Sequence, residues 1–353
     1  MNEVDISRIQ NILVIKLRNI GDVLLATPAI RALKGAMPKA RITALVRMGT
    51  EDMLTLNPGV AEVITFENGR GIAYELGLVR NLRRRKFDLV INMTEGDRGA
   101  VLAFISGAKI RVGIDPNGKG MLGKGHLFTH LVGQQKDRRH RAISDMDVLG
   151  PLGITDADPK VEIFTSAGDD AFIENLLAGN GVGTGQPVAV VHPTSRWLFK
   201  CWRDDAVASV IDYLEGRGFR VAVTAAPDER ELEKARRIIS MVTTRPMDFS
   251  GKLNLKQLTA LFKRSALFFG VDTAPMHMAA AAGTPVVALF GPSDSETWGP
   301  FTDKRRVVLS TDEFPCIPCH KDGCNGSKRS ACLESITVEE AVAAIEDLLE
   351  ADK

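Results

Sequence analysis

Short apolar runs alternate with segments of helical periodicity along this chain, and this alternation limits the possible folds more than any other feature of the sequence. The first apolar run, residues 11–17 (NILVIKL), is followed by the tight turn RNIGD and by apolar residues at helical spacing over residues 23–37. Further apolar runs follow at residues 42–46, 63–66, 89–93 and 110–113. Buried strands separated by helices predict a parallel sheet with helices on both faces.

The same alternation starts again after a glycine-rich stretch at residues 179–185 (GNGVGTG). Its apolar runs are residues 187–191, 220–224, 266–271 and 286–290, and its helical segments are residues 203–215, 228–241, 255–264 and 274–282. A chain of 353 residues also corresponds to two domains of about 100–200 residues each. We therefore predict an α/β protein with two doubly wound, Rossmann-like domains. Their expected bounds are residues 1–165 and 187–335, with a linker at 166–186 and a C-terminal helix at 336–353 that packs back across the domains.

The composition is that of a globular protein, with 44% hydrophobic and 25% charged residues, and it excludes the disordered and fibrous classes. The 45 Lys and Arg residues nearly balance the 44 Asp and Glu residues, so the net charge of +1 gives no general field for nucleic acid. Two local basic runs, residues 80–86 (RNLRRRK) and 136–141 (KDRRHR), are either solvated faces or sites that attract phosphate or an anionic membrane.

No stretch of about 18 apolar residues occurs in the sequence, and its first ten residues (MNEVDISRIQ) lack the apolar centre of a signal peptide. We therefore expect a cytoplasmic protein whose contact with a membrane is peripheral. Two cofactor motifs are also missing. The first strand is not followed by GxGxxG, and the Gly-Lys-Gly triplets within residues 118–125 lack the spacing of a Walker loop, so neither dinucleotide binding nor ATP hydrolysis is expected.

Ligands of open parallel sheets bind beyond the carboxyl ends of the strands, so we expect the chemistry in the loops there, in a cleft between two facing sheets. Asp22 lies at the start of a helix just after the first strand. It can cap that helix, or it can act as a general base toward a hydroxyl group. Arg18, beside it, can hold an anionic acceptor group or pair with Asp22.

The second domain carries cationic and amide groups in the equivalent loops. Asp272 or Thr273 caps a helix with Pro275 in its first turn, and the free amides at such a helix start attract phosphate. His277, one turn further, either faces the same ligand or is a buried structural imidazole. Lys200 is either an exposed lysine or the cation that neutralises a diphosphate leaving group without a metal ion. A carboxylate in one domain with these groups in the other indicates transfer from a nucleoside diphosphate donor to a hydroxyl group.

Three segments carry a more specific signal: KLRNIGDVLLATPAIRALK (16–34), HPTSRWLFKCW (192–202) and FFGVDTAPMHMAAAAGTPVVALFGPSDSETWGPF (268–301). In this order, and over nearly the whole chain, they resemble the lipopolysaccharide heptosyltransferases of glycosyltransferase family 9. KLRNIGD and PTSRWLFKCW are similar to the heptosyltransferase III branch. The resemblance implies a GT-B fold, with two Rossmann-like domains facing each other across a cleft. It also implies inverting transfer of heptose from ADP-heptose to the inner core of lipopolysaccharide, with no cofactor or catalytic metal required.

The resemblance implies roles for individual residues. Asp22 matches the family's catalytic base. Donor binding is implied at Lys200, near the phosphates, and at Asp272, near the donor sugar. The helix start formed by Thr273, Ala274 and His277 is implied to receive the diphosphate. The remaining donor and phosphate contacts are Thr194, Ser195 and Glu229. Acceptor binding is assigned to Arg18 and Asn19.

The implied partners are ADP-heptose, a lipid A–core oligosaccharide as acceptor, and the cytoplasmic face of the inner membrane. The basic runs at residues 80–86 and 138–141 are the candidate membrane contacts. Two alternatives stay open at this stage. One is a GT-B transferase that uses another nucleotide sugar, and the other is a catalytically inactive GT-B protein that only binds its ligand.

Four cysteines, Cys316, Cys319, Cys324 and Cys332, cluster near the C-terminus with the spacing C-x2-C-x4-C-x7-C. Four thiols at such spacings can hold tetrahedral zinc as a structural site. The other interpretation is a loop packed with reduced thiols, as expected in a reducing compartment. Neither interpretation gives these cysteines a catalytic role.

Overall fold

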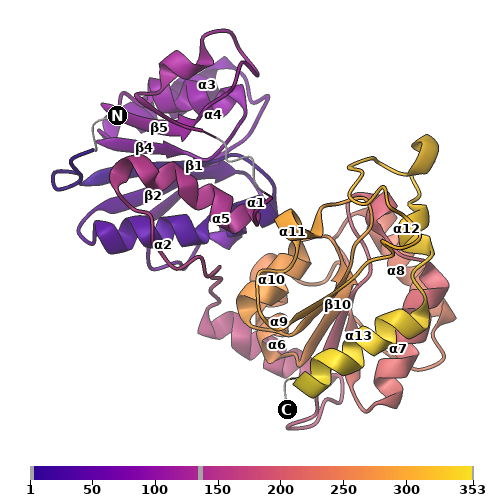
Figure 1. The fold of residues 1–353 in the computed structure, drawn as a ribbon. Helices are drawn as coiled ribbons and strands as arrows, with labels where there is room; N and C mark the ends of the chain where they lie inside the picture. The colour runs from indigo at the N-terminus through magenta and orange to yellow at the C-terminus, as the bar shows by residue number, and fades with distance from the viewer. Residues whose placement is uncertain (1–3, 134–137, 352–353) are drawn as a thin grey trace. The chain divides into compact units, whose positions relative to one another are not determined.

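The computed structural model describes residues 4–133 and 138–351, and the chain divides into two compact units, Met1–Phe164 and Thr165–Lys353. Each unit is a parallel sheet covered by helices (Figure 1), which confirms the predicted α/β class with two Rossmann-like sheets. Lys136 and Asp137, which begin the second basic run, lie outside the described residues.

In the first unit, six parallel strands follow the order β3-β2-β1-β4-β5-β6. The strands are β1 Asn11–Lys16, β2 Arg41–Arg47, β3 Glu62–Phe66, β4 Leu89–Asn92, β5 Ile110–Ile114 and β6 His130–Val132. The helices are α1 Ile20–Leu24, α2 Thr27–Ala36, α3 Ile72–Arg84, α4 Asp97–Ile105 and α5 Arg141–Met146, with 3-10 turns η1 Glu51–Met53, η2 Lys124–Leu127 and η3 Asp147–Leu152. The apolar residues 12–15 are buried, and β1 accordingly lies inside the sheet, paired with β2 and β4.

The single helix predicted over residues 23–37 is in fact two helices, α1 and α2, so this prediction was wrong. Pro28 stands in the first turn of α2, where its missing N–H costs no internal hydrogen bond but where it cannot continue the helix that precedes it. Thr27 Oγ1 instead donates to the Leu24 backbone O at 2.8 Å, at the end of α1. The break leaves α1 as a five-residue helix with Asp22 in its first turn.

The second unit also has six parallel strands, in the order β12-β11-β10-β7-β8-β9. The strands are β7 Val188–His192, β8 Arg220–Val223, β9 Met247–Asp248, β10 Leu267–Val271, β11 Val286–Leu289 and β12 Arg305–Val308. The helices are α6 Ala167–Gly179, α7 Asp204–Gly216, α8 Glu229–Met241, α9 Leu255–Arg264, α10 Ala274–Ala282, α11 Ser295–Trp298, α12 Ala331–Glu334 and α13 Val338–Ala351, with 3-10 turns η4 Leu198–Lys200 and η5 Cys324–Gly326.

Counted from the first strand of each unit, both sheets have the order 3-2-1-4-5-6, which is that of doubly wound nucleotide-binding folds. The edge strands β6, β9 and β12 were missing from the sequence prediction. They are short or begin with charged residues, so none forms the continuous apolar run that marks a buried strand.

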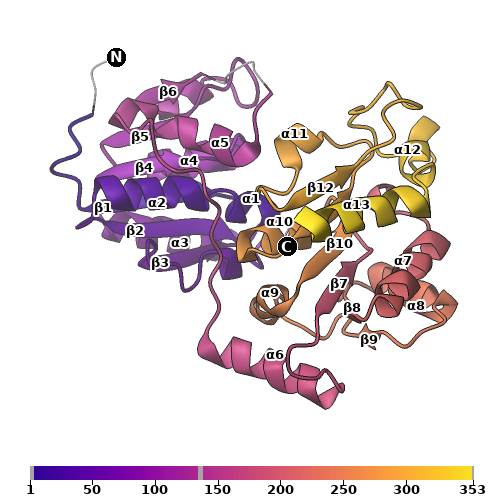
Figure 2. The same cartoon turned by 60° about the horizontal axis from the view of Figure 1, so that its bottom comes forward.

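Two helices near the predicted domain limits pack within the second unit. α6, which lies in the predicted linker 166–186, packs against α9 (Figure 2). α13, the predicted C-terminal helix, packs on α7, β11 and β12 and buries Ala341, Ile345 and Leu348. Among the helices of residues 4–133 and 138–351, none combines the length and hydropathy that crossing a membrane requires.

Gly270 in β10 is a position at which a side chain does not fit. A Cβ atom there would lie 2.7 Å from the His192 backbone O of the neighbouring strand and 2.9 Å from the Phe268 ring. We expect Gly270→Ala to lower the free energy of unfolding by about 1–3 kcal/mol in urea denaturation, because the strands must separate to admit the methyl group. Gly216→Ala is the control, since no atom lies within 4 Å of its new Cβ. Equal stability of the two variants would contradict the prediction.

Candidate active site

The residues predicted from the sequence follow the strands at which each sheet reverses its order. In doubly wound sheets this switch point leaves a crevice at the carboxyl ends of the strands, where ligands bind. Asp22 follows β1 in the first unit, while Lys200 follows β7 and Asp272 follows β10 in the second unit. Each unit therefore carries its predicted polar groups at its own switch point.

Asp22 is a nearly buried carboxylate, 7% exposed, in the first turn of α1. Its Oδ2 accepts a hydrogen bond from the Asn19 backbone N–H at 3.3 Å, which closes the turn after β1. Arg18 Nε lies 3.6 Å from Oδ1, beyond hydrogen-bond distance, and within the described part of the chain no hydrogen-bond donor reaches that oxygen. Asp22 thus both closes the helix start and retains an oxygen that can accept a proton.

A group of charged side chains lies within the electrostatic reach of Asp22. Lys16, at the end of β1, and Asp145, in α5, are each 1% exposed and form an ion pair. Arg141 Nε lies 2.9 Å from the second oxygen of Asp145, and Arg141 also donates to Glu95 Oε1 at 3.0 Å. The charge of Asp22 acts on both Lys16 and Arg141. The sequence prediction missed this group, because its members come from β1, α5 and the loop before α4.

Burial and neighbouring charges compete at these groups. Burial lowers the pKa of the Lys16 ammonium, and the Arg141 guanidinium acts in the same direction, whereas Asp145 and Asp22 favour the charged form. Burial also disfavours the charge of Arg141, but its acidic neighbours outweigh this effect and raise the pKa of Arg141. Partial burial opposes ionisation of Glu95, yet the hydrogen bond from Arg141 leaves the pKa of Glu95 below its usual value.

In the second unit, Lys200 and Asp272 are brought together from loops 72 residues apart, and Lys200 Nζ lies 2.5 Å from Asp272 Oδ2. Thr273 comes next as the N-cap of α10, and Ala274 is the first helical residue. His277 is buried one turn further along the same helix. An ammonium group therefore lies beside the start of a nine-residue helix, an arrangement suited to an anion.

The loop after β7 contributes two further predicted residues, Thr194 and Ser195, and both are buried. Thr194 Oγ1 donates to Glu231 Oε2 at 2.7 Å, and Ser195 Oγ accepts from the Trp197 backbone N–H at 3.3 Å. Thr194 is thereby tied to α8, and Glu231 is a further residue that the sequence prediction did not name.

Glu229, the first residue of α8 after β8, was predicted as a donor-binding residue, and its surroundings differ from those of Glu231. Its side chain is 77% exposed and pairs with Arg236 further along α8. Glu231 instead is buried and faces the loop after β7. The two acids are two residues apart near the start of one helix, so the sequence did not show which of them is buried against the loop after β7. A donor-binding role for Glu229 stays a prediction.

The cysteine cluster lies in the second unit, with Cys332 buried and Cys316 and Cys324 exposed. Burial raises the pKa of Cys332 to about 11, and the other three thiols act in the same direction. Among the described residues, no three His, Cys, Asp or Glu side chains form a group that could hold a metal ion. Zinc binding by Cys316, Cys319, Cys324 and Cys332 stays a prediction.

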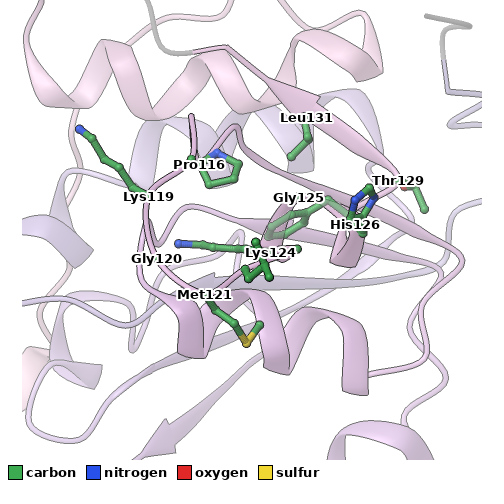
Figure 3. A pocket seen from close by; sticks show the side chains of 13 residues that line it. Pro116, Lys119, Gly120, Met121, Lys124, Gly125, His126, Thr129 and Leu131 are labelled. Atoms are coloured by element: carbon green, nitrogen blue, oxygen red, sulfur yellow. The ribbon is translucent and has the colours of Figure 1, made fainter.

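A pocket of about 690 Å³ lies in the first unit, between Pro116 and Leu131. Figure 3 shows Lys119, Lys124 and His126 among its lining side chains. Lys124 Nζ lies 3.2 Å from an Asp97 oxygen, so its charge is already paired. None of the residues predicted for the active site lines this pocket.

The chain matches the family "Glycosyltransferase family 9 (heptosyltransferase)" over residues 76–329. It is 33% identical over 344 residues to lipopolysaccharide heptosyltransferase 3 of Escherichia coli K12, and the alignment covers 95% of this chain and 97% of that protein. These matches span both units and include the loops that hold Lys200 and Asp272.

Solved structures show the same fold. The glycosyltransferase family 9 structure from Veillonella parvula DSM 2008 aligns with a TM-score of 0.86 at 25% identity, over 99% of this chain and 100% of that one. The E. coli heptosyltransferase WaaC with ADP aligns with a TM-score of 0.74 at 17% identity, over 96% of this chain and 100% of that one. These likenesses confirm the predicted fold class.

The buried imidazole of His192, at the end of β7, makes stability depend on pH. Its Nδ1 lies 2.9 Å from Thr224 Oγ1, and burial lowers the pKa of His192 from 6.5 to about 3. The folded state thus binds this proton less readily than the unfolded state, so stability is full above pH 6.5 and falls as the pH drops toward 3. Between pH 7 and pH 4.5, we expect wild type to lose about 2–3 kcal/mol more than His192→Asn in urea unfolding. An equal loss in both proteins would rule this out.

Proposed function

Because the chain belongs to glycosyltransferase family 9, we propose that it transfers L-glycero-D-manno-heptose from ADP-heptose to the inner core of lipopolysaccharide, with inversion at the anomeric carbon and without a metal cofactor. Family membership makes the chain a glycosyltransferase, as its motifs predicted. The name of the E. coli K12 relative supports heptose and lipopolysaccharide as the reactants. ADP in the WaaC structure supports an adenine nucleotide in the donor.

Asp22 is the proposed general base. Its buried Oδ1 accepts no hydrogen bond from the described residues, so it can take the proton of an acceptor hydroxyl. As that proton moves to Asp22, the hydroxyl oxygen attacks the anomeric carbon on the side opposite the diphosphate. The new C–O bond forms while the bond between the anomeric carbon and the diphosphate oxygen breaks, so the carbon is inverted and ADP leaves with the electron pair. Arg18 and Asn19, next to the base, are the proposed acceptor contacts.

The pairing of Lys200 with Asp272 at the start of α10 is the observation that carries the donor half of this proposal. The leaving diphosphate gains negative charge as its bond to the sugar breaks. An ammonium group at Lys200 and the backbone amides of Thr273 and Ala274 can stabilise that charge without a divalent ion. Asp272 holds Lys200 in place and can also accept hydrogen bonds from the donor sugar.

Other predicted residues support the donor loop. Thr194 and Ser195 lie in the loop that leads to Lys200 and are proposed donor contacts. The Ser195 hydroxyl accepts from the Trp197 backbone N–H and keeps its own proton for a phosphate oxygen, whereas Thr194 donates its proton to Glu231 and holds the loop in place. His277 lies one turn into α10 and is a proposed contact on the same side. Glu229, exposed at the start of α8, is the proposed contact to the ribose.

A lipid-anchored acceptor would bring the protein to the cytoplasmic face of the inner membrane as a peripheral protein. The exposed residues Arg80, Arg83 and Arg84 of α3 are the proposed contacts, together with the run at residues 138–141. Part of this charge is already engaged, because Arg85 pairs with Glu62. The proposed membrane contact is therefore an attraction of α3 to anionic lipid.

Replacing Asp22 with Asn removes the base while keeping the size of the side chain. We expect Asp22→Asn to lower the turnover of ADP-heptose and acceptor at least about 100-fold, measured by ADP release. ADP affinity, measured by calorimetry, should stay within about twofold, because the donor groups belong to the other unit.

Asp147→Asn is the matched control, since Asp147 is an acid of the same unit that pairs with Arg139. This variant should keep wild-type turnover. Normal turnover by Asp22→Asn would remove Asp22 from the mechanism.

Nucleotide binding tests the donor class. We expect calorimetry in EDTA to show that ADP binds at least about tenfold tighter than UDP or GDP, and that added magnesium does not increase the affinity. Lys200→Met should weaken ADP binding about tenfold, because it removes the cation beside the diphosphate. Lys252→Met is the control, because Lys252 lies in the same unit and donates to the Asp248 backbone O. Preference for UDP or GDP would indicate another sugar donor, and no nucleotide binding at all would indicate an inactive protein of this fold.

A further inference from the structure

The pocket between Pro116 and Leu131 has no part in the proposed mechanism, although it opens at the edge of the sheet where Asp22 lies. Its lining begins at Pro116, two residues after β5 ends. β5 and β1 belong to one parallel sheet, so their carboxyl ends lie at the same edge. Ligands of such sheets bind at this edge.

Hydrogen bonds join the pocket to the turn after β1. Lys124, in the lining, donates from Nζ to the backbone O of Glu95. Glu95 follows Thr94, and Thr94 Oγ1 accepts from the Leu17 backbone N–H at 2.8 Å. Leu17 is followed by Arg18, the first of the proposed acceptor contacts. The pocket is therefore next to the loops that receive the acceptor in the proposed function.

The ionisable side chains that line the pocket are all basic: Lys119, Lys124 and His126. None of the 13 lining residues is acidic. Lys124 is balanced by Asp97, outside the lining, at 3.2 Å. Lys119 and His126 lie on either side of Lys124 (Figure 3) and are exposed, and among the residues that the structure describes none pairs with their side chains. The pocket therefore offers an ammonium group and an imidazole to an anion, with no acid in its walls.

The backbone of the same loop supplies further donors. Within the described part of the chain, no acceptor pairs with the N–H groups of Gly118, Gly120, Leu122 and Gly123. Gly120 and Gly123 have φ of 84° and 77°, which residues with a Cβ atom rarely adopt. Successive N–H groups in turns of this kind form concave sites for anions.

The size of the pocket indicates what carries the anion. A volume of about 690 Å³ exceeds that of an inorganic ion and lies within the ~300–1,000 Å³ range of small-molecule sites. Pro116, Phe128 and Leu131 add apolar walls, which suit the C–H faces of a sugar ring. A phosphate group has three terminal oxygens, so it can accept hydrogen bonds from side-chain and backbone donors at once.

We propose that this pocket binds a phosphorylated sugar residue of the acceptor, an inference that rests on the proposed function. Lys119, His126 and the glycine amides hold the phosphate, and the apolar walls hold the ring. The pocket is thus a second anchor for the acceptor, besides Arg18 and Asn19, and it selects acceptors that carry a phosphate.

Saturation-transfer NMR with glucose 6-phosphate as the probe tests the pocket without requiring activity. Saturating ADP is added, so that the proposed diphosphate site of the second unit is filled. We expect glucose 6-phosphate to bind wild type and Lys119→Met to bind it about fivefold to tenfold more weakly, because a charge-assisted hydrogen bond is lost. Lys119→Arg, which keeps the charge, should retain most of the affinity. His126→Phe is a second variant and should also bind the probe more weakly.

Lys109→Met is the matched control, because Lys109 is an exposed lysine of the same unit that does not line the pocket. It should bind glucose 6-phosphate as wild type does. Lys119 and Lys109 are both exposed, so neither substitution should disturb folding.

Three results would overturn the inference. The first is that wild type does not bind glucose 6-phosphate, or that Lys119→Met and His126→Phe bind it as tightly as wild type. The second is that glucose binds as tightly as glucose 6-phosphate, since the phosphate would then not be recognised. The third is that inorganic phosphate binds as tightly as glucose 6-phosphate, since the site would then take the free ion rather than a sugar phosphate.

The transfer reaction gives a second measurement. We expect Lys119→Met to raise the KM for a phosphorylated acceptor about fivefold, with kcat and the KM for ADP-heptose unchanged, because the lost contact serves binding alone. After phosphatase treatment of the acceptor, wild type and Lys119→Met should have the same KM. A wild-type protein without heptosyl transfer would overturn the proposed function instead, and the binding of glucose 6-phosphate would still test the pocket. The two failures are therefore distinguishable.

Discussion

Each unit depends on one constraint: its first strand is buried and pairs in parallel with a neighbouring strand on each side. β1 lies between β2 and β4, and β7 lies between β8 and β10. The chain therefore leaves these strands toward opposite halves of the sheet, and side chains just after them lie at a crevice rather than in a packed layer. Asp22 and Lys200 occupy the two equivalent positions, which explains why short loops can hold polar groups next to an apolar core.

Buried or half-buried charges near the ends of the first strands are each paired with a side chain of opposite charge. Lys16 meets Asp145 in the first unit, and Lys200 meets Asp272 in the second. Buried ion pairs contribute little net stability, since the cost of removing two charges from water offsets much of their attraction. These two ion pairs therefore satisfy the charges that the fold brings together and add little to the free energy of unfolding.

Most of the architecture could be predicted from periodicity, because central strands of parallel sheets are continuous apolar runs and their helices have regular spacing. The failures have local reasons. Pro28 divides one predicted helix into α1 and α2, and the short edge strands β6, β9 and β12 lack an apolar run. In the site, the sequence did not show that Glu231 turns inward to Thr194, because spacing along one helix start does not show which acid is buried. A donor contact at Glu229 stays a prediction.

The sequence by itself determined the family, the two α/β units and the loops that carry Asp22, Lys200 and Asp272. Each of these features depends on residues that are neighbours along the chain, in a motif or an apolar run. Tertiary structure alone decided which side chains meet. Lys16 and Asp145 are 129 residues apart, and Lys200 and Asp272 are 72 apart, yet each pair forms an ion pair. The physical reason is that such contacts depend on strand order and on burial, which set distance and dielectric environment between segments that no local pattern connects.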